Sequence, residues 1–209
     1  RRPIRLIMTA DEEAGSEVGA HWLVEHHPDL IADCTEAIGE VGGFSLTVRD
    51  DLRLYLVQVA EKGLAWLNLI ADGTAGHGSV PLRSNAVVKL TTAVSTVAKW
   101  KPPISFNETT AAYFKRLATI SDPAAADRYR AILSTDPKVQ DTADEYFLDN
   151  EPRHASTIRT SISPTMIQAG YRTNVIPSEV AATLDVRMMP DQDPAAFLEM
   201  VKKVVNDPT

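Results

Sequence analysis

The order of five apolar segments between residues 64 and 205 constrains the fold of this chain more than any other feature. Some segments have the composition and alternation of strands, and the others repeat with the period of an amphipathic helix. In chain order they predict a strand over 64–71, a helix over 85–100, strands over 160–170 and 179–189, and a helix over 193–205.

The segment 107–149 interrupts that order with a mixed polar pattern that predicts helices. Asp-Pro pairs at 122–123 and 136–137 break it, because proline cannot continue a helix. Without this insertion, which we place at about 101–159, the order is strand, helix, strand, strand, helix. That is a ferredoxin-like βαββαβ unit without its last strand, so we expect an α/β (α+β) fold.

The beginning of the chain predicts a different kind of domain. Its predicted elements are a strand over 4–9, a helix over 14–26, and strands over 34–38 and 52–59. Acidic residues follow the early strands, at the edge where open α/β sheets bind ligands. We therefore expect part of an α/β domain over 1–61 and a second domain over 62–209, in a piece of a longer chain.

Composition excludes several classes of protein. A net charge of −7 without a basic stripe argues against a nucleic-acid surface. Cys34 is the only cysteine, which excludes an internal disulfide and a thiolate metal cluster. No apolar run reaches the roughly 18 residues of a membrane span, and no signal peptide is visible. We expect a cytoplasmic protein that binds neither nucleic acid nor membrane.

Three neighbouring carboxylates, Asp11, Glu12 and Glu13, come directly after the first predicted strand. Adjacent carboxylates repel one another, and a multivalent cation is the natural compensation. The alternative is structural, because acids in the first turn of a helix complement its dipole without binding a ligand. Glu40 has a similar pair of interpretations, as a ligand or as part of a surface turn before two glycines.

His77 lies in a loop over 73–81 that contains three glycines. Small residues let a backbone or ligand approach closely, although a turn that contains a histidine by chance explains the loop equally well.

Arg187 interrupts an apolar strand. Facing inward it needs an anionic partner, and facing outward it is a solvated edge residue. No site is indicated by the remaining histidines, which are His21, His26, His27 and His154. The adjacent pair His26 and His27 suits the end of a helix, where cations complement the helix dipole.

Six segments together resemble the M20 family of metallopeptidases in their order and approximate spacing. They read TADEEAG at 9–15, GEVGGFS at 39–45, EKG at 61–63, GHGSVP at 76–81, NVIP at 174–177 and DVRMMP at 185–190. The junction at Lys62 and the long insertion are most similar to the carboxypeptidase S-like and aminoacylase-like branch of that family.

The resemblance implies a two-zinc catalytic α/β domain and a lid, or dimerisation, domain of ferredoxin-like fold. It assigns Glu12 as the general base, Glu13 as a ligand of one zinc and Glu40 as a carboxylate ligand of the other. Cobalt or manganese could serve in place of zinc. Two such metals share a water and lower its pKa, and a neighbouring carboxylate takes its proton.

The resemblance also assigns three lid residues to the substrate. His77 matches a histidine that reaches the active site of the partner subunit and polarises the scissile carbonyl. Asn174 and Arg187 match residues that hold the substrate, and a bidentate Arg187 suits a free carboxylate. These assignments imply a homodimer formed through the lid and a substrate that is a small peptide or an N-acyl amino acid.

The family's pattern also includes a His-x-Asp upstream of Asp11 and a histidine downstream of the lid, and neither lies in these 209 residues. Zinc takes about four ligands, so two carboxylates are too few. We therefore expect an internal fragment of a zinc-dependent amide hydrolase, inactive alone and binding zinc weakly or not at all. Two alternatives remain open, a non-catalytic dimerisation module and a degenerate, metal-free family member.

Overall fold

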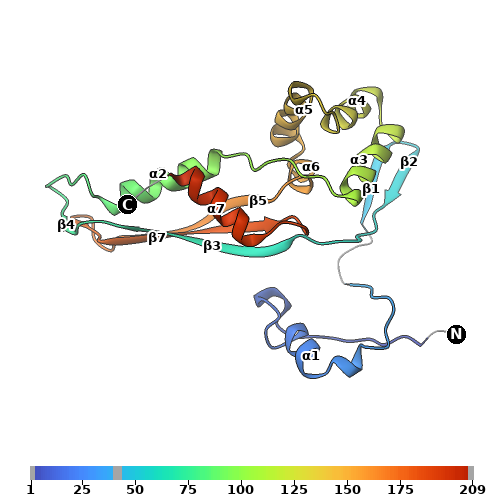
Figure 1. Cartoon of the computed structure of the whole chain (residues 1–209), viewed down its shortest axis with the longest axis horizontal. Coiled ribbons are helices and arrows are strands. Elements are labelled where there is room, and N and C mark those ends of the chain that lie inside the picture. Colours follow the sequence, from blue (N-terminus) through green and yellow to red (C-terminus); the bar gives the residue numbers. More distant parts are fainter. Residues whose placement is uncertain (1–2, 40–43, 207–209) are drawn as a thin grey trace. The chain divides into compact units, whose positions relative to one another are not determined.

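The computed structural model describes residues 3–39 and 44–206 of the 209-residue chain. The chain divides into two compact units, Arg1–Gly42 and Gly43–Thr209, and most of the residues belong to the second (Figure 1). No helix in the described ranges is both long enough and apolar enough to cross a membrane. The expected domain boundary between residues 61 and 62 stays a prediction.

A three-stranded antiparallel sheet lies at the centre of the second unit. Its strands are β3 (Gly63–Asp72), β7 (Glu179–Met188) and β5 (Ser161–Ala169), in the spatial order β3-β7-β5. The strands predicted over 64–71, 160–170 and 179–189 are therefore confirmed. In a ferredoxin-like unit the third strand lies between the first two, as β7 does here, and the fourth strand lies beside the first.

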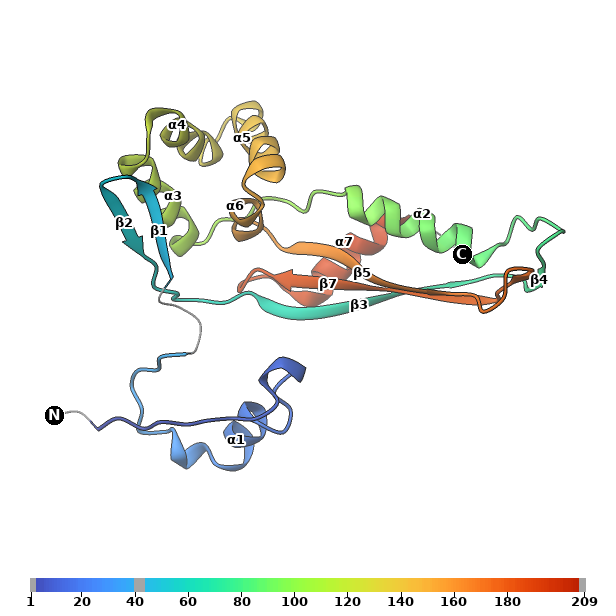
Figure 2. The same ribbon diagram turned by 180° about the vertical axis from the view of Figure 1, so that it is seen from behind.

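Helices α2 (Ala86–Lys99) and α7 (Pro194–Val205) cover one face of this sheet, as both views of the ribbon show (Figures 1 and 2). Each begins at a side-chain cap, because Asn85 and Asp193 each accept a hydrogen bond from a backbone N–H of the first turn. Both helices are confirmed at the positions that their apolar periodicity predicts.

The apolar core of this layer lies between the sheet and the two helices. Along β7 every second side chain is buried against them, which is the alternation expected of a strand with one covered face. Burying a large apolar side chain fully stabilises a fold by about 1.5–3 kcal/mol. The largest contributors are Leu90, Val97, Leu184, Val186, Phe197 and Val201.

A helical insertion between α2 and β5 has a core of its own. Its helices are α3 (Glu108–Ile120), α4 (Pro123–Ile132), α5 (Pro137–Asn150) and α6 (Pro152–Thr157). The stacked rings of Phe114 and Phe147 lie at the centre of that core, with centroids 5.7 Å apart. Asp122 and Asp136 cap α4 and α5, so the Asp-Pro pairs that predict breaks are the starts of new helices.

Two short antiparallel ribbons complete the second unit. Strands β1 (Ser45–Arg49) and β2 (Leu52–Tyr55) form a hairpin, and Leu54 packs against the core of the insertion. The predicted strand over 52–59 thus ends at Tyr55. Strands β4 (Gly76–His77) and β6 (Val175–Ile176) pair at the far end of the sheet.

Residues 3–39 of the first unit contain three short helical segments: η1 (Glu12–Ala14), α1 (Ala20–His26) and η2 (Pro28–Leu30). The strands predicted over 4–9 and 34–38 are wrong, because no strand forms among residues 3–39. A strand needs a neighbour for its backbone hydrogen bonds, and Ile4 and Met8 are 95% and 88% exposed. The predicted helix over 14–26 is shortened because Gly15 and Ser16 adopt positive φ angles of 112° and 62°.

A buried ion pair joins the insertion to the sheet. Asp144 on α5 contacts the guanidinium of Arg159, just before β5, and both side chains are 4% exposed. Lys101, between α2 and the insertion, approaches the same carboxylate at 3.6 Å and pairs with Asp141 at 2.8 Å. Removing one member of a buried pair leaves the other charge uncompensated in a low-dielectric interior.

We expect Asp144→Ala to lower the free energy of unfolding by about 3–5 kcal/mol, because Arg159 then remains buried without its counter-charge. Asp141→Ala is the matched control on the same helix, since its exposed carboxylate should contribute less than about 1 kcal/mol. Urea unfolding of the two variants measures the difference. Equal losses would contradict the assignment of Arg159 and Asp144 as the anchor of the insertion.

Candidate functional site

Arg187 lies on the face of the sheet that α2 and α7 leave uncovered. It belongs to the central strand, so it is not the edge residue that an outward orientation suggests from the sequence. Its Nε and Nη2 donate to the carboxylate of Asp185 at 2.8 and 3.1 Å, and the pair raises the pKa of Arg187. The side chain is 52% exposed, and Nη1 is the guanidinium nitrogen outside this pair.

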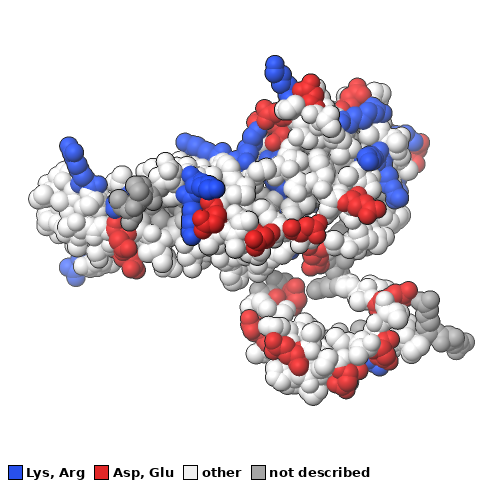
Figure 3. All heavy atoms as spheres, viewed as in Figure 1, with Lys and Arg blue, Asp and Glu red and all other residues white. Residues whose placement is uncertain are grey.

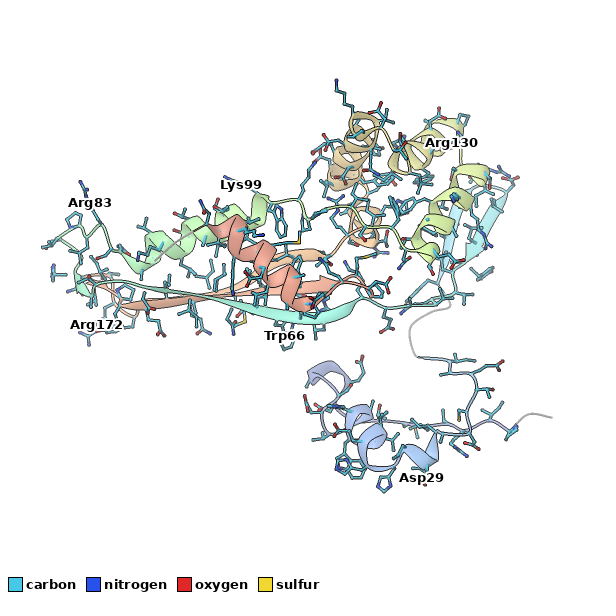
Figure 4. The ribbon with its side chains drawn as sticks, viewed as in Figure 1. Asp29, Trp66, Arg83, Lys99, Arg130 and Arg172 are labelled. Carbon is cyan, nitrogen blue, oxygen red and sulfur yellow. The ribbon has the colours of Figure 1, made fainter. Side chains whose placement is uncertain are left out.

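The surroundings of Arg187 on this face are partly apolar. Trp66 pairs in register with Asp185, and Leu64 with Arg187, so their side chains share its side of the sheet. Figure 4 shows Trp66 on β3 directed away from the two covering helices. Trp66 is 62% exposed.

An open pocket of about 490 Å³ lies beside Arg187. Figure 3 shows Lys and Arg side chains interspersed with Asp and Glu over the visible face of the second unit. The pocket is lined by two cationic side chains, one acidic side chain and four neutral residues. Its lining comes from the segment before β3, from α6, from β5 and from β7: Gln58, Ala60, Glu61, Lys62, Ser156, Ser161 and Arg187.

Lys62 is held by two uncharged oxygens at this pocket. Its Nζ donates to the carbonyl oxygen of Ser156 at 2.9 Å and to Oγ of Ser161 at 3.0 Å. Partial burial, with Arg159 and Arg187 nearby, lowers the pKa of Lys62 to about 8. The sequence marks Lys62 only as part of a junction, so sequence reasoning missed it as a site residue.

His77 and Asn174 lie next to each other at the other end of the sheet. The β4–β6 pairing puts His77 opposite Val175, and the N–H of Gly78 donates to the carbonyl of Asn174 at 2.8 Å. A Cβ on Gly78 would lie 3.4 Å from the backbone of Asn174, at ordinary van der Waals contact, so the two backbones lie close together here. Figure 4 shows Arg83 and Arg172 at this same end.

The hydrogen bonds of His77 define which ring nitrogen carries its proton. The backbone N–H of Ser79 donates to Nδ1 at 3.2 Å, and Oγ of Ser79 lies 2.7 Å from the same atom. Because a backbone N–H can only donate, Nδ1 is the acceptor and the neutral ring is protonated on Nε2. His77 is exposed, so it presents an N–H donor to whatever approaches this end.

The length of the sheet separates the two groups. Asp72, five residues before His77, pairs with Glu179 at the start of β7, and Arg187 lies eight residues further along that strand. Eight residues of a strand span about 26 Å. His77 and Asn174 of one chain therefore lie at one end of the sheet, and Arg187 lies at the other.

The acidic triplet divides into different environments. Asp11 adopts a φ of 66°, and its carboxylate accepts a hydrogen bond from the N–H of Val18 at 3.2 Å, so it stabilises its own turn. Glu12 opens η1 and is exposed. The side chain of Glu13 and the whole of Glu40 lie outside the described residues. Within the described part of the chain, no group of three or more His, Cys, Asp and Glu side chains could hold a metal ion.

His154 belongs to a polar cluster in the insertion that sequence reasoning did not find. Its Nδ1 lies 2.5 Å from the carboxylate of Glu151, and its Nε2 lies 3.1 Å from the hydroxyl of Tyr113. Burial next to Glu151 also raises the pKa of Tyr129 to about 12. Tyr113 lies on α3, Tyr129 on α4, and Glu151 between α5 and α6, so only the folded insertion brings these partners together.

Comparison with known proteins identifies relatives of the chain. A family model described as the peptidase dimerisation domain of the M20 group matches residues 59–209. Human N-fatty-acyl-amino acid synthase/hydrolase PM20D1 is 30% identical over 152 residues, which cover 73% of this chain and 30% of that protein. A probable carboxypeptidase S-like 2 from Dictyostelium discoideum is 25% identical over 99% of this chain and 40% of its own length.

A solved structure of an M20 family metallo-carboxypeptidase from Sulfolobus solfataricus is also similar, at 20% identity and a TM-score of 0.41. The match covers 69% of this chain and 40% of that structure. The chain thus spans well under half the length of the relatives named here. The extent of the match over residues 59–209 nevertheless identifies the family, and the chain belongs to the M20 peptidases through their dimerisation domain.

Proposed function

We propose that this protein hydrolyses amide bonds in small peptides or N-acyl amino acids, with residues 62–209 as its lid and dimerisation domain. Residues 1–61 contribute part of the catalytic domain in this proposal. Support comes from the family membership and from the names of relatives, one a carboxypeptidase S-like protein and one an N-fatty-acyl-amino acid synthase/hydrolase. The cytoplasmic location stays a prediction.

The observation that carries the proposal is the chemistry at the two ends of the lid sheet. At one end His77 presents Nε2–H, the type of donor that stabilises negative charge developing on a carbonyl oxygen. Asn174 beside it offers a second polar contact to the substrate. At the other end Arg187 offers a guanidinium that suits the terminal carboxylate of a peptide or acyl amino acid.

Glu12 is the proposed general base. An exposed carboxylate on a short turn can accept a proton from an attacking water and then deliver it to the leaving amine. We propose zinc as the metal of the enzyme, with Glu13 and Glu40 each giving one carboxylate ligand. The described residues alone do not form such a metal site, so the chemistry argued for this chain rests on Glu12, His77 and Arg187.

The proposed homodimer forms through the lid. The position beside β3 is the place of a fourth strand in a ferredoxin-like sheet, which leaves β5 as the outer strand available to a second copy. Met166 and Ile167 on β5 are each 54% exposed. Association of two such edges buries apolar surface and pairs backbone groups across a two-fold axis.

We expect Glu12→Gln to lower kcat about 100- to 10,000-fold in an active preparation of the protein, because the amide cannot accept the proton of the water. The bound zinc, measured by elemental analysis, should stay unchanged. Glu13→Gln should instead lower the zinc content. Glu17→Gln, which changes another exposed acid of the same unit, is the matched control and should leave kcat unchanged. Loss of zinc in Glu12→Gln would assign Glu12 as a ligand.

We expect sedimentation to reveal a concentration-dependent dimer, because β5 offers an outer edge with exposed apolar side chains. Ile167→Lys should shift the equilibrium toward the monomer, since it places a charge at that edge. Val139→Lys on α5, also at an exposed apolar position, is the control and should leave the equilibrium unchanged. A strict monomer at high concentration, or equal effects of the two variants, would contradict dimerisation through this edge.

A further inference from the structure

Lys62 takes no part in the chemistry proposed so far, although it lines the same pocket as Arg187. An ammonium has three N–H donors, and those of Lys62 that have described partners donate to a carbonyl and a hydroxyl. Within the described residues, two such bonds leave one N–H of Nζ for a ligand in the pocket. Both partners are uncharged, so they orient the ammonium without neutralising it.

The nearby charges make this ammonium unusual. Arg159, one of two cations next to Lys62, is buried and has Asp144 as its counter-charge. Arg187 shares the pocket and keeps Nη1 outside its pair with Asp185. Glu61 is the one acid of the pocket lining, and the amide of Gln58 donates to it. Among the residues that the structure describes, no carboxylate pairs with Lys62. A half-buried cation in that state is costly, and an anion entering the pocket would lower the cost.

We propose that Lys62 and Arg187 bind one carboxylate together in this pocket, so that Lys62 is a substrate-binding residue. This proposal rests on the proposed function, because it takes the substrate carboxylate to be the group that Arg187 recognises. The hydrogen bonds that Nζ donates to the carbonyl oxygen of Ser156 and to Oγ of Ser161 hold it in place for that contact. Lys62 then supplies a point charge, and Arg187 supplies the directional N–H groups.

The shared anion has a consequence for pH dependence. The pKa of Lys62 is about 8 without a ligand, whereas Arg187 stays charged over the whole range of neutral and mildly basic pH. A bound carboxylate favours the ammonium, so binding and protonation of Lys62 support each other. The affinity for a carboxylate should therefore be highest below pH 8 and fall as the pH rises through 8.

The test measures binding of N-acetylglycine to the 209-residue chain by NMR titration at pH 7 and pH 9. N-acetylglycinamide, which lacks the carboxylate, is the control ligand. The variants are Lys62→Met, which removes the charge, Lys62→Arg, which keeps it, and Arg187→Leu. Lys115→Met changes an exposed lysine on α3 and is the control variant. Circular dichroism confirms that each variant is folded.

We expect wild-type affinity for N-acetylglycine to fall about five- to tenfold from pH 7 to pH 9, because the pKa of Lys62 without a ligand is about 8. Lys62→Met should weaken binding at pH 7 about tenfold or more, the cost of one charge-assisted contact, and should abolish the pH dependence. Lys62→Arg should retain affinity at pH 9, and Lys115→Met should behave as wild type. If Lys62→Met does not fold, the wild-type pH dependence and the Lys62→Arg variant decide the question.

Unchanged affinity in Lys62→Met, or equal wild-type affinity at the two pH values, would overturn the role of Lys62. If Arg187→Leu still abolishes binding in that case, the proposed function stands. Unchanged binding in Arg187→Leu would instead contradict the carboxylate site of the proposed function. No binding to the wild-type chain, or equal binding of N-acetylglycinamide, would overturn the shared carboxylate site.

Discussion

The alternation of buried and exposed side chains along β7 is the constraint on which the second unit depends. Val186 and Leu184 are fully buried under the helices, and this fixes Asp185 and Arg187 on the opposite face. A shift of register by one residue would bury the ion pair and expose the core, which is far less favourable than the observed arrangement. The packing of an ordinary apolar core therefore decides where the guanidinium is presented.

The junction between the sheet and the insertion depends on a second set of polar contacts. Asp144 compensates the buried charge of Arg159, and Lys62 ties the start of β3 to α6 and β5. Lys62 and its partners Ser156 and Ser161 line the pocket next to Arg187, so α6 of the insertion forms part of its wall. The insertion is thus a structural part of the site as well as a helical layer of its own.

Local patterns predicted the second unit well, because its core strands and helices pack against one another within the described part of the chain. The strand over 4–9 was wrong for the opposite reason, since its apolar residues find no neighbouring strand among residues 3–39. Lys62 could not be recognised from the sequence, because its hydrogen-bond partners lie 94 and 99 residues further along the chain. The ionic partner of Arg187 lies two residues away on the same strand, so that pair follows from strand geometry.

The central claim is that one chain cannot bring its own His77 and Arg187 to the same small substrate, because the length of the sheet lies between them. Each of His77→Ala and Arg187→Leu should be inactive alone, and their co-expression in an active preparation tests the claim most directly. Mixed dimers should contain one intact site, and random pairing should restore about a quarter of the wild-type rate. No recovery in dimers shown to be mixed would contradict a site built from two chains.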